Sequence, residues 1–155
     1  MATSSTQPRN CSVARTLEIV GEKWALLAVR EVFLGNRRFD EMVRKTGAPR
    51  DTMTARLKTL VAAGVLERRP VSEHPPRFEY RLTQAGLDLY PVIVALMQWG
   101  DTYLIGGGER PMTLTHHCGH PLGSVTVCAT CGEAVNARDV RATPLSEREI
   151  ILSKY

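Results

Sequence analysis

Three of the four cysteines in this chain lie close together near its C-terminal end, beside three of its four histidines. Cys128 and Cys131 are separated by two residues and followed by glycine, a spacing typical of knuckles that bind zinc. Cys118 lies upstream, with nine residues between it and Cys128, and is also followed by glycine. A fourth ligand would come from a histidine, in the order of preference His116, His120 and His117. Because three cysteines and one histidine fill a tetrahedral shell, the predicted zinc site is structural rather than catalytic.

The segment between Cys118 and Cys128 indicates the local structure that such a zinc site would stabilise. Ser124–Val127 alternates polar and apolar residues, which predicts one strand of a small β-hairpin. No histidine has the usual two-residue spacing to Cys118. Two other states therefore remain open, a redox disulfide between Cys128 and Cys131, and reduced thiols in a β appendage without metal.

Cys11 stands apart from this group and precedes a predicted helix, with Arg9 and Arg15 nearby. A helix N-terminus and neighbouring cations stabilise a thiolate, so Cys11 is a candidate redox sensor. The alternative is a small, inert, half-buried side chain, and the residues alone leave both interpretations open.

Catalytic chemistry is not indicated elsewhere in the sequence. We find no nucleophile paired with a base, no phosphate-binding glycine loop and no cluster of carboxylates, so the chain is not expected to be an enzyme. No apolar run is long enough to span a bilayer, and residues 1–10 lack the apolar core of a signal peptide. We therefore expect a cytoplasmic protein without membrane partners.

The charge is concentrated in one part of the chain. Residues 36–81 hold eleven Lys and Arg against six Asp and Glu, a net charge of +5, whereas the whole chain carries +4. The remainder is therefore slightly acidic. Such a basic segment suits a polyanion, because Lys and Arg displace the counterions condensed on phosphates.

The same segment predicts a particular order of elements. An amphipathic helix, Asp40–Thr46, is followed by a turn at Gly47–Pro49 and a second helix, Arg50–Ala63. Two short strands, Val65–Pro70 and Phe78–Leu82, come next. A helix-turn-helix followed by a β-hairpin wing is most often a DNA-binding module. The expected fold is mainly α with a small β wing (α+β), together with the small C-terminal β-hairpin appendage that zinc would staple.

Three further helices should complete this domain. Val13–Val20 is predicted with Ser12 as its N-cap, and Lys23–Leu34 is apolar on so many sides that it should form the buried centre. A long helix, Thr83–Leu104, should kink or split at Pro91. Its apolar surplus favours packing against a symmetry-related subunit. We expect a disordered leader at residues 1–10 and a winged domain at residues 11–105. A linker at residues 106–111 should lead to a Cys/His-rich β appendage at residues 112–142. A tail with a short helix should follow at residues 143–155.

Three segments together resemble an HxlR-type winged helix-turn-helix regulator of the MarR-like group. They are CSVARTLEIVGEKWALLAVREVFLGNRRFDEM, TMTARLKTLVAAGVLERR and PPRFEYRLTQAGLDLYPVIVALMQWG, within Cys11–Leu104, about 60% of the chain. The resemblance implies a transcription factor, more often a repressor, that acts as a homodimer on a palindromic operator. It implies a dimer interface of N-terminal and long C-terminal helices, and a Cys11 that senses oxidants, quinones or aldehydes. Many relatives have proline after this cysteine, where this chain has Ser12.

The resemblance also assigns DNA contacts. Contacts to base edges in the groove fall on Arg50, Thr52, Thr54, Arg56 and Lys58. Contacts of the wing with phosphate or the minor groove fall on Arg68, Arg69 and Arg77, and secondary phosphate contacts on Lys23, Arg37 and Arg38. On the second helix, the pattern places Thr54 and Arg56 at the borders of the outward face, and on the wing it places Arg68 on the polar side. The partners would be double-stranded DNA, a second copy and a small-molecule effector. The alternative function is a winged-helix protein-interaction adaptor with a zinc-ribbon-like module.

Overall fold

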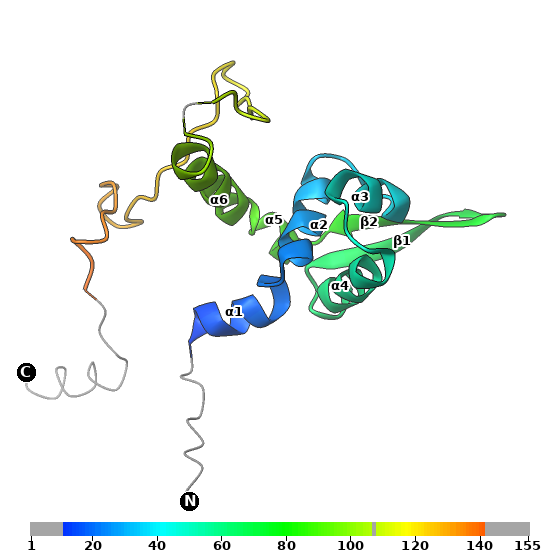
Figure 1. Ribbon diagram of the computed structural model, residues 1–155. Helices are drawn as coiled ribbons and strands as arrows, with labels where there is room; N and C mark the ends of the chain where they lie inside the picture. The colour runs from blue at the N-terminus through cyan, green and yellow to red at the C-terminus, as the bar shows by residue number, and fades with distance from the viewer. Residues whose placement is uncertain (1–10, 107, 142–155) are drawn as a thin grey trace, which may run out of the picture. The chain divides into compact units, whose positions relative to one another are not determined.

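The computed structural model describes residues 11–106 and 108–141 (Figure 1). The predicted leader and the predicted C-terminal short helix lie outside these residues. The chain divides into two compact units, residues 1–100 and 101–155. The described elements are, in order, α1 Ser12–Val20, α2 Lys23–Phe33, α3 Phe39–Thr46, α4 Arg50–Ala62, β1 Leu66–Glu73, β2 Pro76–Leu82, α5 Gln84–Leu87 and α6 Tyr90–Tyr103. This is a mainly helical winged helix-turn-helix with a two-stranded wing, as the sequence predicts.

Helix α2 forms the centre of the first unit. Ala25, Ala28, Val29 and Val32 are buried, and the helix contacts α1, α3, α4 and β2. One charged residue, Glu31, is buried with them at 2% exposure. Its carboxylate accepts hydrogen bonds from Arg30 and Asn36 at 2.6 Å, and the Asn36 backbone N–H donates to the Glu31 carbonyl at 2.9 Å. Because both carboxylate oxygens have partners, Glu31 fixes the loop that leads to α3.

The turn between α3 and α4 is fixed by local hydrogen bonds. Gly47 has a φ of +73°, a left-handed conformation that favours glycine, and its N–H donates to the Val43 carbonyl. The Thr46 hydroxyl accepts from the Ala48 N–H at 3.2 Å, and Ala48 itself is buried. Pro49 is the N-cap of α4, with φ −57° and ψ 139°, and its carbonyl accepts the first helical hydrogen bond from the Met53 N–H at 2.9 Å. The turn therefore sets the angle at which α4 leaves α3.

The wing is longer than predicted, because pairing continues beyond a bulge between Pro70 and Ser72. Arg68 pairs in register with Tyr80, whereas Glu67 pairs with Arg81. Opposed residues share a face of the sheet, so Arg68 lies on the Tyr80 face and the prediction of a polar-side position is wrong. The Tyr80 N–H also donates to the Arg37 carbonyl at 2.9 Å, which holds the segment before α3 beside β2.

The predicted long C-terminal helix is divided into α5 and α6, and Pro91 is the second residue of α6. Proline fits this first turn, where its missing N–H is not needed. Thr83 caps α5 as expected, since its hydroxyl accepts from the Gly86 N–H and donates to the carbonyl of Gly64. Gly86 is buried at this junction of wing and helix. A Cβ there would overlap the Val65 carbonyl oxygen and lie 2.9 Å from Leu82 Cδ2.

Helix α1 begins one residue before the predicted start. Cys11 is the N-cap and Ser12 is already helical, so the prediction of a Ser12 cap is wrong; the Ser12 carbonyl instead accepts from the Thr16 hydroxyl. Of the predicted apolar stripe only Val20 is buried, while Val13 and Leu17 are 66% and 53% exposed. Among residues 11–106 and 108–141, no helix combines the length and apolar character needed to cross a bilayer.

The second unit contains no β-hairpin in its described part, so that prediction is wrong. Its described pairing is limited to two isolated bridges, Thr115 with Pro121 and Val127 with Ala134. Ser124–Val127 does not form a strand. The physical reason is the lack of a core: Val125 and Val127 are 79% and 52% exposed, so a sheet here would have no apolar face to bury.

Gly86 provides a test of the junction between wing and α5. We expect Gly86→Ala to lower the free energy of unfolding by about 1–3 kcal/mol, because the added methyl must displace backbone or Leu82. Gly100→Ala is the matched control, since a Cβ there meets nothing within 4 Å and should be neutral or stabilising by about 0.5–1 kcal/mol. Thermal and urea unfolding measure both. Equal stabilities of the two variants would contradict this packing.

Candidate nucleic-acid interface

The outward face of α4 is defined by the side that is buried. Met53, Leu57 and Leu60 are buried, so the exposed side carries Arg50, Asp51, Thr54, Ala55 and Lys58. Thr54 therefore lies on the exposed face rather than at its border, which corrects the prediction. Thr52 and Arg56 are half-buried on the flank. The Arg56 Nε atom is buried and has no hydrogen-bond partner within the described residues.

A groove of about 600 Å³ brings residues of three segments together. Thr54 comes from α4, Arg68 and Arg77 come from the wing, and Arg38 comes from the segment before α3. All four were predicted as DNA contacts from separate stretches of sequence. Phe39, Asp40, Pro76, Phe78 and Tyr80 complete the lining. The groove thus joins the second helix to the wing in one basic surface, within the first unit.

Aromatic rings support two of the arginines. The Arg68 guanidinium lies 3.5 Å from the centroid of the Phe78 ring. The Arg50 guanidinium lies 4.8 Å from the centroid of Phe39 and also pairs with Asp40 at 2.8 Å. A ring face attracts a cation and limits its rotamers while leaving its N–H groups available to an anion. These contacts hold the guanidinium groups in place without neutralising Arg68.

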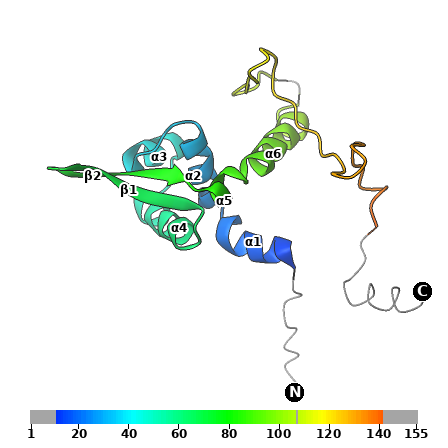
Figure 2. The same ribbon diagram turned by 180° about the vertical axis from the view of Figure 1, so that it is seen from behind.

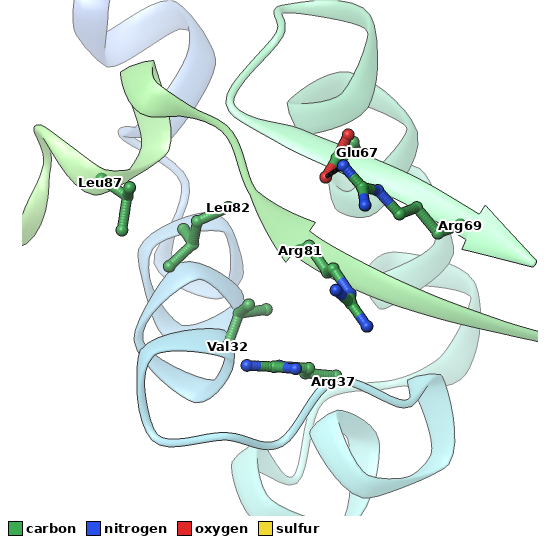
Figure 3. A pocket seen from close by; sticks show the side chains of 7 residues that line it. All are labelled: Val32, Arg37, Glu67, Arg69, Arg81, Leu82 and Leu87. Carbon is green, nitrogen blue, oxygen red and sulfur yellow. Dashed lines mark ion pairs between the residues drawn. The ribbon is translucent and has the colours of Figure 1, made fainter. Parts of the chain in front are cut away.

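Two predicted phosphate contacts lie in a second pocket instead. Arg37 and Arg69 line a pocket of about 310 Å³ with Arg81, Glu67 and three apolar residues, Val32, Leu82 and Leu87 (Figure 3). Arg69 pairs with Glu67 at 2.7 Å, and Arg81 lies 3.7 Å from Glu79. Three cations against one lining carboxylate leave this pocket positive, so it also suits a phosphate.

The sequence pattern did not single out three residues of these surfaces. Phe39 and Phe78 support arginines, and Arg81 contributes the third cation of the second pocket. The sequence held no signal for the Arg68–Phe78 contact, because these residues become diagonal neighbours only through the observed register, in which Arg68 pairs with Tyr80 and Pro70 with Phe78. Lys23, predicted as a secondary contact, lies at the start of α2 with its Nζ 4.2 Å from the Trp24 ring centroid, outside both pockets.

The cysteines lie outside both pockets. Cys11 is exposed in the single chain. Cys118, Cys128 and Cys131 carry no disulfide in the structure. Within residues 11–106 and 108–141, no group of three or more Cys, His, Asp or Glu side chains lies close enough together to hold a metal ion.

The fold and the basic groove define the class of DNA-binding winged helix-turn-helix regulators. Within this class the chain belongs to the HxlR-like helix-turn-helix family, which matches residues 19–106. It is a transcriptional regulator of the helix-turn-helix type and not an enzyme.

Three similar proteins support this assignment. An uncharacterized HTH-type transcriptional regulator of Mycobacterium tuberculosis is 49% identical over 134 residues, which is 86% of this chain and 85% of the relative. The crystal structure of PA1607, described as a candidate transcription factor, is 36% identical and covers 88% of this chain and 96% of its own, with a TM-score of 0.79. The redox regulator HypR in its reduced form is 29% identical and covers 59% of this chain and 92% of its own, with a TM-score of 0.52.

Arg77 tests the role of the wing. Arg77→Ala should weaken binding to every DNA sequence alike and reduce the slope of log K against log salt by about 1 for each copy of the chain, because one phosphate contact is lost. Fluorescence anisotropy over a salt series measures the slope. Arg138→Ala removes an exposed cation from the second unit and serves as the control. An unchanged slope in Arg77→Ala, or an equal loss in the control, would place the contact elsewhere.

Proposed function

We propose that this regulator is a homodimeric, sequence-specific repressor that binds a palindromic operator through α4 and the wing. The observation that carries the proposal is the shared groove, in which Thr54 of α4 lies with Arg38, Arg68 and Arg77. A helix that enters the major groove exposes small polar and basic side chains, while the adjoining wing and loop follow the phosphates. An operator occupied in this way is closed to the transcription machinery.

Roles follow from the position of each side chain. Thr54 and Lys58 are exposed on α4 and suit contacts to base edges, with Arg50, Thr52 and Arg56 flanking them. Arg68, Arg77 and Arg38 line the same groove and suit phosphates or the minor groove. Arg37 and Arg69 suit phosphates farther along the backbone, together with Arg81. Lys23, outside both pockets, remains a secondary phosphate contact in this proposal.

Dimerisation is supported by apolar surface on two helices. On α6, Ile93 and Val94 pack inward, whereas Val92 and Leu96 are 46% and 53% exposed. On α1, Leu17 is equally exposed. Large apolar side chains at helical spacing on the outer side of two helices are typical of a subunit interface. A twofold dimer would place two copies of α4 roughly 34 Å apart, which is one turn of DNA and explains a palindrome.

The proposal is tested by measuring mass and DNA binding together. Analytical ultracentrifugation should show a dimer for the wild type and a monomer for Leu96→Glu, because a carboxylate in an apolar interface is costly. Leu96→Glu should bind a palindromic operator selected from random sequence at least tenfold more weakly than the wild type. Leu34→Glu changes an exposed apolar residue outside both helices and is the control. A wild-type monomer, or affinity that does not depend on salt, would refute the proposal.

We propose that the regulator responds to a redox signal through modification of Cys11. This thiol is exposed, it is the N-cap of α1, and the helix that follows carries the exposed Leu17. HypR, a redox regulator by its description, has a similar fold. Modification of Cys11 would alter the packing of α1 in the dimer and with it the separation of the two copies of α4.

The Cys11→Ser variant distinguishes a sensing thiol at this position from an inert thiol. In the wild type, hydrogen peroxide or a quinone is expected to change operator affinity at least several-fold, and dithiothreitol should restore it after peroxide. Cys11→Ser should bind DNA normally and lose most of this response, whereas Cys131→Ser should keep it. The measurement is operator affinity before and after treatment. A full response in Cys11→Ser would rule out Cys11 as the sensor.

A further inference from the structure

The second pocket, of about 310 Å³ between α2, α5 and the wing, has an apolar side as well as a charged side (Figure 3). Val32 of α2, Leu82 of β2 and Leu87 of α5 form the apolar side. Val32 belongs to the hydrophobic core and Leu82 packs against it, whereas Leu87 is 46% exposed. A phosphate would occupy the charged side and leave these aliphatic side chains uncovered. The lining therefore favours a ligand with both an anionic part and an apolar part.

The charged side carries guanidinium groups that the protein does not fully satisfy. Arg37 makes no ion pair within the described part of the chain. The Arg81 Nε atom is buried and has no hydrogen-bond partner among the same residues. The Nη2 atom of Arg81 lies 3.7 Å from Glu79, which is beyond hydrogen-bond length. Arg69, in contrast, is paired with Glu67 at 2.7 Å, so Arg37 and Arg81 are the cations available to a ligand.

The charge balance of the pocket indicates which anion it fits. Its three arginines face two carboxylates, the lining Glu67 and the neighbouring Glu79, so one positive charge remains. A monocarboxylate balances this charge, whereas a phosphate dianion exceeds it. The fork of N–H groups on a guanidinium also matches the two oxygens of a carboxylate. Because no aromatic ring lines the pocket, the apolar part of the ligand is expected to be a short aliphatic chain.

We propose that the second pocket binds a short aliphatic monocarboxylate as an effector of this regulator. The carboxylate accepts hydrogen bonds from Arg37 and Arg81, and a small rotation of Arg81 brings its unpartnered Nε–H into this contact. The aliphatic chain covers the apolar side and removes the exposed Leu87 side chain from water. The effector and a DNA phosphate exclude each other at Arg37, because both need the same guanidinium.

Glu79 links this pocket to the groove beside α4. It pairs in register with Arg69 and therefore lies on the pocket face of the wing. One oxygen of its carboxylate is 3.7 Å from Arg81 and the other is 3.9 Å from Arg38, which lines the groove. A ligand carboxylate on Arg81 displaces Glu79 toward Arg38, whose charge is then less available to a phosphate. The effector thus lowers DNA affinity, a step that rests on the proposed function, whereas binding of the effector does not.

NMR titration of the isotope-labelled full chain without DNA tests the site. Hexanoate should bind about tenfold more tightly than acetate, which lacks the chain, and hexanamide, which lacks the charge. Inorganic phosphate should bind equally weakly, and hexanoate should shift the Arg81 Nε–H signal.

Variants locate the binding of hexanoate. Arg81→Gln and the more exposed Arg37→Gln should each lose most of it, whereas Arg44→Gln, which removes an exposed cation of α3 outside both pockets, should retain it. Circular dichroism checks that each variant is folded. Hexanoate that binds no more tightly than acetate, hexanamide or phosphate would overturn the proposal, as would full binding in Arg37→Gln.

Operator affinity at saturating hexanoate tests the link through Glu79, with the same concentration of acetate as the control for ionic strength. The wild type should bind its operator about threefold more weakly in hexanoate, the size expected when one partly exposed ion pair changes partner. Glu79→Gln should still bind hexanoate and show a smaller effect on DNA. Unchanged operator affinity in the wild type would overturn the role as an effector, and an undiminished effect in Glu79→Gln would overturn the link. Absence of operator binding without hexanoate would instead refute the proposed function and leave the NMR result unaffected.

Discussion

The packing of α4 against the core is the interaction on which the rest of the structure depends. Met53, Leu57 and Leu60 are buried in the cluster that α2 centres, so only one side of α4 remains exposed. Because a helix is a rigid cylinder, burying these three side chains also fixes the direction of Thr54 and Lys58. The turn at Gly47 and Ala48 and the buried Glu31 then hold α3 and its preceding loop in place. A basic surface of defined shape is the result.

The wing extends this surface by backbone geometry more than by side-chain packing. The Tyr80 N–H binds the Arg37 carbonyl, and Thr83 joins the end of β2 to the start of β1 through the carbonyls of Gly64 and Val65. Arg69 and Arg81, from one face of the sheet, line one pocket (Figure 3), whereas Arg68, from the other face, lines the groove beside α4. Ring contacts and neighbouring carboxylates limit the motion of these arginines, which lowers the entropy lost when they bind a polyanion. Viewed from behind, the wing extends well beyond α3 and α4 (Figure 2).

The two units differ in the forces available to them. The first has a continuous apolar core and reaches a defined winged fold by burying it. The second has exposed valines, tight glycine turns and three free cysteines, and its described residues form turns without a sheet. One chain therefore combines a core-stabilised helix-turn-helix unit with a unit whose described residues have no comparable apolar core.

Periodicity and turn chemistry in the sequence were sufficient for the order of the winged elements, for helix bounds within about two residues, and for the break near Pro91. These depend on neighbouring residues, and so does the Thr83 cap.

The register of the wing, the stacking of Arg68 on Phe78 and the position of Thr54 on the exposed face were not accessible in this way. They arise when segments distant in sequence pack together, and a bulge or a small rotation changes which side chains meet. The alternation of Ser124–Val127 was misleading for the same reason, since a strand needs an apolar partner surface that only a tertiary fold can supply. The sequence by itself thus determined which elements form and where the positive charge lies. Only the tertiary structure decided which of those charges share a groove, because burial of α4 and pairing of the wing are long-range interactions.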